Sequence, residues 1–242
     1  MPAQLFMESD ADDSLARRVH QVLARIRHTA ERAGRSPETV RLVAATKTVS
    51  AERIREGLRA GLSLLGENRM QEALSKVALL RDLSPRWHFI GQLQRRKVRD
   101  AIGTFELIHS VDSVELAQEI NRRAGDAGVK QAVLLEVNIA GEASKAGFHP
   151  DTLMRDLGIL GDLPHLRIQG LMTIPPPTEQ PEDARPHFRG LRELGARIAA
   201  KGMPSLVMQE YSMGMSYDFE VAIEEGATLV RIGTAIFGER NV

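Results

Sequence analysis

The stretch Leu42-Val43-Ala44-Ala45-Thr46-Lys47 is a run of small or apolar residues that ends in a lysine. Its length and composition are typical of a buried strand. Burial disfavours the charged ammonium form of a lysine and so favours its neutral amine. A lysine at the end of an apolar strand therefore suggests that the protein uses this neutral amine. The common use is a Schiff base with an aldehyde or ketone. The alternative, for this segment alone, is a strand that reaches the surface and ends in a solvated lysine.

Further strand-like segments follow this one, and segments with helical periodicity separate them. The predicted strands cover residues 42–47, 62–65, 87–91, 105–110, 132–139, 166–173, 205–211 and 228–232. Alternating strands and helices indicate parallel β-α-β units, and eight units in 242 residues predict an α/β fold, a TIM-type (β/α)8 barrel. The alternative, an open doubly wound sheet, would usually show a glycine-rich turn after its first strand, and Thr46-Lys47-Thr48-Val49 is no such turn.

Several predicted helices begin at residues that commonly cap helices. Ser14 is predicted to cap a helix that precedes the barrel. Ser50 and Ser216 are predicted to cap helices that follow strands of the barrel. Asp112 and Glu115 have the spacing of a capping box at the start of another helix. The barrel is therefore expected to carry one extra helix at its N-terminal side.

The domain organisation that follows is simple. Residues 13–242 are predicted to form a single barrel domain, and residues 1–12 a flexible acidic arm in front of it. The basic segment 94–102 is predicted as a helix with a solvated face. A role for it in binding a phosphorylated or nucleic-acid partner is the alternative.

Composition excludes several classes of function. Lys plus Arg and Asp plus Glu both number 32, so the zero formal charge argues against nucleic acid or an anionic membrane as a partner. The chain has no cysteine, which excludes disulfides, thiolate metal sites and cysteine nucleophiles. No histidine, aspartate and glutamate spacing predicts a metal site. Since the start lacks the layout of a signal peptide and no apolar run has membrane-spanning length, a cytoplasmic protein is expected.

Polar residues stand at the ends of the predicted strands, where barrels of this type carry their functional groups. These residues are Lys47, Asn68, His88, His109, Asn138, Thr173, Ser212 and Arg231. A single histidine at a strand end is more often a hydrogen-bonded core residue than a base. The two methionines Met172 and Met213 are expected to line the mouth of the barrel.

The turns after the seventh and eighth strands predict a phosphate site. Ser212-Met213-Gly214-Met215-Ser216 offers two hydroxyl groups and a glycine that permits close approach. Gly233-Thr234 offers a second glycine and a third hydroxyl group. Barrels commonly bind phosphate between these two loops, through backbone N–H groups. Each turn alone is better explained by a helix cap with a tight-turn glycine, and it is the presence of two such turns on adjacent loops that favours phosphate binding.

Arg231 lies in the eighth strand, two residues before the second turn. A buried arginine needs a partner. In the barrel mouth it could face the pyridine nitrogen of pyridoxal phosphate (PLP), the cofactor most often bound to a lysine amine. The alternative is a structural arginine paired with a carboxylate such as Glu67 or Glu136.

The order of these motifs resembles the pyridoxal phosphate homeostasis proteins of the YggS/PROSC type over nearly the whole chain. The segments that carry the resemblance are 42–48, Gly66-Glu67-Asn68, Trp87-His88-Phe89-Ile90-Gly91, His109-Ser110-Val111-Asp112, Val137-Asn138 with Ser144-Lys145-Ala146-Gly147, Gly170-Leu171-Met172, Ser212-Met213-Gly214-Met215-Ser216 and 230–238. One position departs from the family: Arg96 stands where its Leu-Gln-x-x-Lys segment often has asparagine. No role of that segment is therefore carried over.

The resemblance implies an alanine-racemase-like barrel without the second domain of that enzyme. It implies PLP held as an internal aldimine on Lys47, with Arg231 at the pyridine nitrogen. The cofactor-binding residues expected from motifs and resemblance together are Lys47, Asn68, Met172, Ser212, Met213, Gly214, Arg231, Gly233 and Thr234. The family is regarded as non-enzymatic and concerned with the supply of free PLP. Apo forms of PLP-dependent enzymes are the expected recipients.

Three functions fit the sequence: a PLP carrier or regulator, a PLP-dependent amino-acid racemase, and a barrel enzyme that uses Lys47 directly on an aldol-type substrate. The racemase needs a second acid/base group on the face of the cofactor opposite the lysine. The resembling racemases take a tyrosine from their second domain, and the two tyrosines here, Tyr211 and Tyr217, both lie beside the predicted phosphate turn. Binding without catalysis is therefore the preferred interpretation, and the expected lack of the racemase's second domain favours a monomer.

Overall fold

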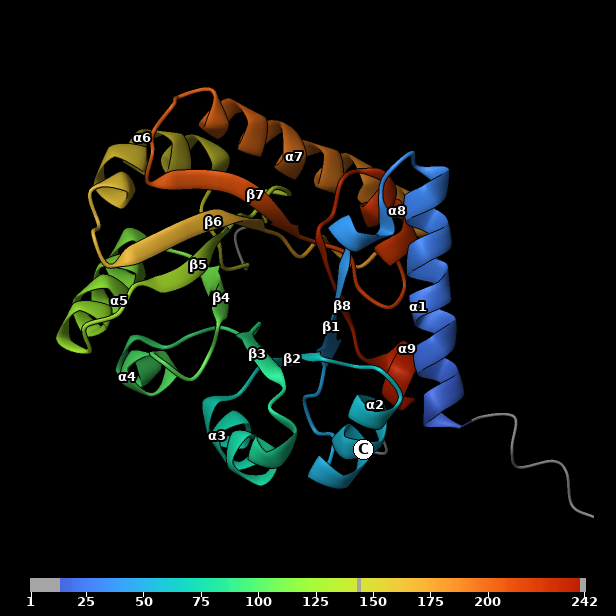
Figure 1. The fold of residues 1–242 in the computed structure, drawn as a ribbon. Helices are drawn as coiled ribbons and strands as arrows, with labels where there is room; N and C mark the ends of the chain where they lie inside the picture. Colours follow the sequence, from blue (N-terminus) through green and yellow to red (C-terminus); the bar gives the residue numbers. More distant parts are fainter. Residues whose placement is uncertain (1–13, 143–144, 240–242) are drawn as a thin grey trace, which may run out of the picture.

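The computed structural model describes residues 14–142 and 145–239, so the predicted arm at 1–12 lies outside the described residues. Eight parallel strands close into a barrel in which each strand pairs with its sequence neighbours, and β8 returns to β1 (Figure 1). The strands are β1 (Arg41–Ala45), β2 (Leu64–Glu67), β3 (Arg86–Phe89), β4 (Leu107–Val111), β5 (Gln131–Glu136), β6 (Leu166–Met172), β7 (Leu206–Ser212) and β8 (Leu229–Ile232). The prediction of a (β/α)8 barrel is confirmed.

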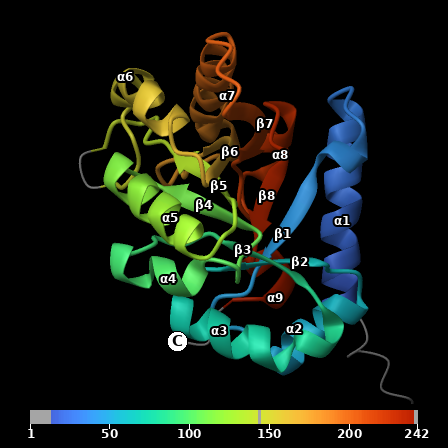
Figure 2. The ribbon, with the colours of Figure 1, turned by 60° about the vertical axis from the view of Figure 1, so that its left-hand side comes forward.

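Helices surround the barrel and follow the strands in turn (Figure 2). The α-helices are α1 (Leu15–Arg32), α2 (Ala51–Arg59), α3 (Met70–Leu79), α4 (Val98–Ala101), α5 (Val114–Asp126), α6 (Pro150–Gly161), α7 (Arg185–Ala199), α8 (Phe219–Glu224) and α9 (Thr234–Phe237). Short 3-10 helices are η2 (Pro37–Thr39), η3 (Arg81–Leu83), η4 (Arg95–Lys97) and η5 (Pro181–Ala184). In the part of the chain described, no helix combines the length and apolar character needed to cross a bilayer.

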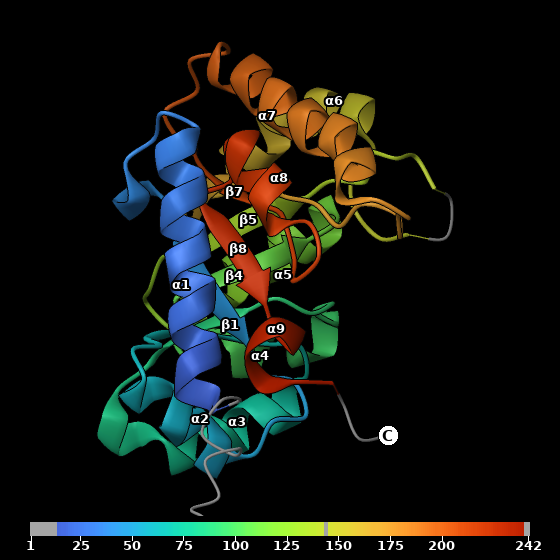
Figure 3. The same ribbon diagram turned by 90° about the vertical axis from the view of Figure 1, so that its right-hand side faces the viewer.

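The extra N-terminal helix is present and lies outside the barrel. Helix α1 runs alongside α8 and α9 (Figure 3). Its buried face includes Val19, Val22 and Ile26, which recur at helical spacing. The Ser14 side chain accepts a hydrogen bond from the backbone N–H of Arg17 at 3.3 Å, as the predicted cap requires. Helix α1 therefore covers the side of the barrel where its first and last strands meet.

Side chains of the strands alternate between two apolar layers. One buried cluster fills the barrel with Val43, Leu64, Ile90, Leu107, Ala132, Leu134, Met172 and Leu229. Residues of the opposite parity, such as Ala44, Leu65 and Ile108, belong to the larger cluster between strands and helices. This alternation is the expected pattern of a barrel whose lumen is packed rather than open. It also assigns the inward direction to alternate residues, with a change of parity at the irregularities in β4 and β6.

Several element boundaries differ from the prediction. The fifth strand ends at Glu136 rather than at residue 139, because Val137 bridges to Phe148 and Asn138 N–H donates to the Phe148 carbonyl. The predicted helix 94–102 is a 3-10 turn, η4, followed by the single-turn helix α4. A periodic pattern does not distinguish these short elements from one continuous helix.

Two of the predicted helix caps are wrong, at the starts of α5 and α8. Helix α5 is capped by Ser113, whose hydroxyl accepts from Leu116 N–H, and not by Asp112 and Glu115. Helix α8 begins after Asp218, and the Ser216 hydroxyl accepts from other residues. Ser50 does cap α2.

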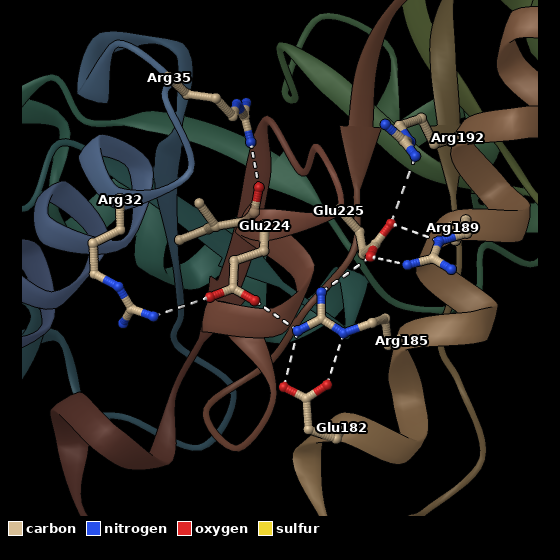
Figure 4. Close-up of polar contacts among 9 residues, drawn as sticks. Arg32, Arg35, Glu182, Arg185, Arg189, Arg192, Glu224 and Glu225 are labelled. Atoms are coloured by element: carbon tan, nitrogen blue, oxygen red, sulfur yellow. Dashed lines mark hydrogen bonds and ion pairs between the residues drawn. The ribbon is translucent and has the colours of Figure 1, made fainter.

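Helix α8 is held from the α7 side by a cluster of arginines around one glutamate (Figure 4). Glu225, which is 5% exposed, follows the last residue of α8. It accepts hydrogen bonds from Arg185 Nη1 at 3.0 Å and Arg189 Nη2 at 2.8 Å, and Arg192 Nη2 lies 3.7 Å from its carboxylate. Networked charges with fixed geometry contribute more than single surface pairs do. Glu225 is thus the centre of the contact between α7 and α8.

Helix α8 is also held from the side of α1 (Figure 4). Arg35 Nη1 donates to the Ile223 carbonyl at 2.7 Å, and Arg32 lies 3.7 Å from Glu224. Glu224 in turn accepts from Arg185 at 2.6 Å. Because α8 directly follows the turn after β7, these contacts fix the helix that supports one wall of the barrel mouth.

We expect Glu225→Gln to lower the free energy of unfolding by about 1–3 kcal/mol at neutral pH, because charge-assisted hydrogen bonds are lost at a buried position. Glu182→Gln is the matched control. Its side chain is 64% exposed and also bonds to Arg185, so a change below about 0.5 kcal/mol is expected. Urea unfolding of both variants measures the difference.

This difference should depend on pH. The Arg189 hydrogen bond lowers the pKa of Glu225, so its contribution is present above the ordinary glutamate pKa and is lost as pH falls through the lowered value. Protonated Glu225 and glutamine are both neutral. The stabilities of wild type and Glu225→Gln should therefore converge in acid, and a constant gap down to pH 2 would contradict the assignment.

Candidate functional site

A cavity of about 940 Å³ opens at the C-terminal ends of the strands, around the junction of β1 and β8. Its lining includes five of the residues predicted from the sequence: Lys47, Asn68, Arg231, Gly233 and Thr234. The pairing of β1 with β8 explains this convergence, since Val43 is in register with Arg231 and Ala44 with Ile232. Residues far apart in the chain therefore share one cavity wall.

Lys47 lies two residues beyond the end of β1. Val43 belongs to the cluster inside the barrel and Ala45 packs against it, so the same parity places Lys47 on the inward side. The strand stops before the lysine because the chain turns there: Val49 N–H donates to the Thr46 carbonyl at 3.0 Å. Thr48 has a φ of +64°, in the left-handed region. Lys47 is half-buried and lines the cavity.

Arg231 is buried at the bottom of this cavity, at 5% exposure. Its guanidinium donates from Nη1 to the Ser212 carbonyl at 2.8 Å and to Ser212 Oγ at 2.6 Å, and from Nη2 to the Thr173 carbonyl at 2.9 Å. Burial lowers the pKa of Arg231 to about 10, so it remains a cation at neutral pH. The sequence alternative of an ion pair with Glu67 is wrong, because Glu67 pairs with Lys76.

The second carboxylate considered as a partner of Arg231, Glu136, acts at longer range. Burial, together with the charge of Asp112, raises the pKa of Glu136 to about 7, and the charge of Arg231 opposes both effects. Arg231 is thus held by neutral oxygen acceptors rather than by a contacting carboxylate.

Two histidines continue the hydrogen bonds of Arg231 across the barrel. His109 Nδ1 lies 2.8 Å from Ser212 Oγ, and His109 Nε2 lies 2.9 Å from His88 Nδ1. Arg231 can only donate to the Ser212 hydroxyl, which in turn donates to His109 Nδ1. His109 then carries its proton on Nε2, donates to His88 Nδ1, and leaves the proton of His88 on Nε2. Both rings are core residues that set the orientation of Ser212.

Burial keeps both histidines neutral. It lowers the pKa of His88 to about 3, and it also lowers the pKa of His109, to which the charge of Arg231 adds. The expectation that these strand-end histidines are hydrogen-bonded core residues agrees with their contacts. Neither lines the cavity.

The two turns predicted to bind phosphate lie against each other. The backbone N–H groups of Gly233 and Ala235 both point at Ser216 Oγ, at 3.3 and 3.4 Å. A side chain in place of Gly233 would bring its Cβ to 3.1 Å from the Ala45 carbonyl oxygen. The Arg231 N–H donates to the Gly214 carbonyl at 3.0 Å, which links the turns at their base. The cavity wall therefore presents converging donors and hydroxyl groups at one point.

Four of the predicted residues do not line the cavity. Met172 is buried inside the barrel, and Ser212 is buried beneath Arg231. Met213 was expected at the mouth, but its side chain packs in the outer apolar layer and its N–H bonds to the Leu229 carbonyl. Gly214 has a φ of +90°, and an added Cβ would lie 2.5 Å from Ala222 Cβ. Gly214 therefore permits the close approach between this turn and α8, and it does not face the cavity.

The cavity also contains residues that the sequence did not predict to bind the cofactor, among them Thr48, Arg53, Ile90, Ile174, Tyr217, Phe237 and Glu239. Ile90 has the signal of a strand end, because it follows β3 as Asn68 follows β2. Arg53 lies in the first turn of α2. The sequence around it does not indicate that the start of this helix borders the cavity. Its Nη2 donates to the Phe237 carbonyl at 3.2 Å.

The residues present fit PLP, judged by four features. The donors of Gly233 and Ala235 suit a phosphate oxygen, since two backbone N–H groups already converge on one oxygen. Arg231 supplies a cation for the ring nitrogen, and Lys47 an amine for the aldehyde. Asn68 Oδ1 is buried and has no hydrogen-bond partner within the described residues. Over the same residues, no group of three His, Asp or Glu is arranged to hold a metal ion.

Comparison with known proteins agrees with this class of site. Residues 19–241 match the family described as alanine racemase, N-terminal domain. The pyridoxal phosphate homeostasis protein of Aquifex aeolicus is 50% identical, over 93% of this chain and 97% of that protein. The corresponding protein of Pseudomonas aeruginosa is 44% identical, over 94% and 96%.

Solved structures give the same result. PipY of Synechococcus elongatus, solved with PLP bound, is 37% identical with a TM-score of 0.82, over 93% of this chain and 100% of that chain. Alanine racemase of Clostridium difficile, at 15% identity and a TM-score of 0.69, shares the fold over 93% of this chain and 60% of its own. Fold and match together define a barrel of the alanine racemase N-terminal type. The chain belongs to the family of the pyridoxal phosphate homeostasis proteins, and the resemblance inferred from the sequence is confirmed.

The histidine arrangement predicts an NMR result. His88 and His109 should stay neutral from pH 8 to pH 5, each protonated on Nε2, because burial opposes the imidazolium. Nitrogen-15 shifts of the ring atoms distinguish the tautomers. An imidazolium signal from either buried ring at pH 6 would contradict the assigned hydrogen bonds.

Proposed function

We propose that the protein binds PLP, holds it covalently through the amine of Lys47, and serves PLP homeostasis without catalytic turnover. The observation that carries the proposal is the convergence of Lys47, Arg231 and the Gly233-Thr234 turn on one cavity. When bound, PLP supplies an aldehyde that reacts reversibly with a lysine amine and a pyridine ring that accepts electrons. The relatives named for PLP homeostasis, and PipY with PLP bound, support the assignment.

Each residue of the site has a distinct task in this proposal. The N–H groups of Gly233 and Ala235, with the hydroxyls of Ser216 and Thr234, would bind the phosphate group. Arg231 would face the pyridine nitrogen, and a permanent cation there keeps that nitrogen unprotonated. This weakens the ring as an electron sink, so it favours retention of the cofactor over chemistry on it.

The positions of the tyrosines favour binding over racemisation. The racemase alternative needs a second acid/base group in the cavity. Tyr217 reaches the cavity, but its hydroxyl donates to the Glu179 carbonyl at 2.5 Å. Tyr211 lies outside the barrel against α7, where an added Cβ at Gly195 would be 2.3 Å from its hydroxyl oxygen. Among the described residues, neither tyrosine is placed as the partner of Lys47.

The proposal extends to the biological setting. It describes a monomer in the cytoplasm that passes PLP to apo forms of PLP-dependent enzymes. Transfer is tested by mixing the PLP-loaded protein with an apo-enzyme and comparing the recovery of enzyme activity with that from an equal amount of free PLP. Gel filtration of the loaded protein tests the monomer.

Lys47→Ala should abolish covalent PLP binding. Wild type incubated with PLP should show a visible absorption band, and borohydride followed by peptide mass spectrometry should place a pyridoxyl group on Lys47. The exposed Lys201→Ala variant is the control and should behave as wild type. A pyridoxyl group that persists on another lysine in Lys47→Ala would refute the site assignment.

D- and L-alanine should not be racemised by the PLP-loaded protein, because within the described residues neither Tyr211 nor Tyr217 is placed as a second base opposite Lys47. Chiral chromatography after prolonged incubation is the measurement, with a bacterial alanine racemase as positive control. Sustained turnover that disappears in Lys47→Ala would replace the carrier function with the racemase alternative.

A further inference from the structure

A second lysine lies behind the segment that carries Lys47. Lys76, on the buried face of α3, is 6% exposed. Its Nζ donates to the Thr46 carbonyl at 2.6 Å, to Glu67 Oε1 at 2.7 Å and to Glu72 Oε1 at 2.6 Å. An ammonium has three N–H donors, and these three acceptors use all of them. Lys76 is therefore a fixed cation with no lone pair to offer an aldehyde.

The same two carboxylates hold the residues on either side of Lys47. Glu67 Oε1 accepts from Thr46 Oγ1 at 2.6 Å, and Glu72 Oε1 accepts from the Thr48 N–H at 2.6 Å. Thr48 is in the left-handed region at φ +64°, which a β-branched residue adopts only when its surroundings impose it. The contacts thus begin one residue before the lysine and end one residue after it. They restrict the backbone from which the Lys47 side chain projects.

We propose that Glu67, Glu72 and Lys76 are positioning residues that fix the backbone of Lys47 so that its amine meets the aldehyde of PLP. The inference rests on the proposed function, since it concerns the same lysine. Glu72 and Lys76 come from α3 and Glu67 from the end of β2, so the unit following β2 sets the geometry at the end of β1.

The buried charges of Glu67 and Lys76 can hold in place the turn that carries Lys47. A turn just past a strand end is normally among the more mobile parts of a fold. Here Lys76 and Glu67 form an ion pair with side-chain exposures of 7% and 0%, and buried charge pairs tolerate little displacement because a separated pair leaves an uncompensated charge. Movement of Thr46 would break its bonds to this pair, and movement of Thr48 would break its bond to Glu72, which also pairs with Lys76. The turn therefore takes its rigidity from the buried ions.

The two lysines consequently have opposite roles. Lys47 projects into the cavity, whereas Lys76 is enclosed by three oxygen acceptors and acts as a structural cation. A purely structural function for the cluster, joining α3 to the barrel, is the competing explanation. It predicts lower stability on mutation, with no change in how bound PLP is oriented.

Variants of Glu72 separate these explanations, because its side chain is 24% exposed and its removal leaves most of the core intact. Glu72→Ala removes the acceptor of the Thr48 N–H, whereas Glu72→Gln keeps an oxygen at that position. Loss of a hydrogen bond of this kind should raise the half-saturating PLP concentration about ten-fold in Glu72→Ala, and Glu72→Gln should recover most of the loss. Glu56→Ala, on the exposed face of α2, is the control.

Induced circular dichroism in the cofactor absorption band, per bound PLP, reports the orientation of the cofactor. We expect it to change in Glu72→Ala and to return in Glu72→Gln. The double variant Glu67→Gln/Lys76→Met removes the buried ion pair, leaves only the partly exposed carboxylate of Glu72, and should show the same loss. Thermal unfolding of the PLP-free proteins records the stability of each variant separately.

Wild-type affinity and dichroism in Glu72→Ala and in the double variant would overturn the inference, and so would a loss of thermal stability with unchanged dichroism. Borohydride trapping on wild type distinguishes this from failure of the proposed function. If wild type carries no pyridoxyl group on Lys47, the proposed function fails. If wild type is labelled and the variants bind PLP as wild type does, only the positioning role fails.

Discussion

The pairing of β1 with β8 is the interaction on which the rest of the site depends. Four residue pairs, from Arg41 with Leu229 to Ala44 with Ile232, join the first strand to the last. These pairs join segments that are more than 180 residues apart in the chain. The loop-closure entropy lost in joining them is therefore offset only when all the intervening units have folded. Once closed, the barrel places Lys47 next to the turn that follows β8. An open sheet of the same strands would hold these two segments at opposite edges.

Closure also places a cation inside the barrel, and the polar interior is arranged around it. Arg231 is in register with Val43, so its side chain enters the lumen above apolar residues. A buried guanidinium requires acceptors, and it finds them in the Ser212 hydroxyl and in two backbone carbonyls that end β6 and β7. The two histidines beside this network are neutral, because a second positive charge next to Arg231 would be repelled. The acceptors that stabilise Arg231 are therefore neutral, and its positive charge stays available at the cavity.

The sequence predicts the barrel and much of the site because both depend on periodic signals. Apolar strands and glycine-containing turns repeat in order, and the rule that function gathers at the C-terminal strand ends brings Lys47, Asn68, Arg231 and Gly233 together. What the sequence does not predict depends on side-chain direction at irregular positions. Met213 lies in the outer layer because Ser212, directly before it, faces Arg231 inside the barrel; the register shift that sets this direction lies earlier in β7. Ser216 has the composition of a helix cap, yet its hydroxyl faces the neighbouring turn.

The two lysines show most clearly where local sequence stops being informative. Lys47 is marked by the apolar strand before it, whereas Lys76 sits in an ordinary amphipathic helix and carries no signal at all. Their difference arises from tertiary position: Lys76 contacts two carboxylates and a carbonyl inside the fold, and Lys47 lines the cavity. A protein that must bind an aldehyde at one amine benefits from this division, because a second neutral amine nearby would compete for it. Pairing the second lysine with carboxylates removes that competition and at the same time supplies the rigid support that the first one needs.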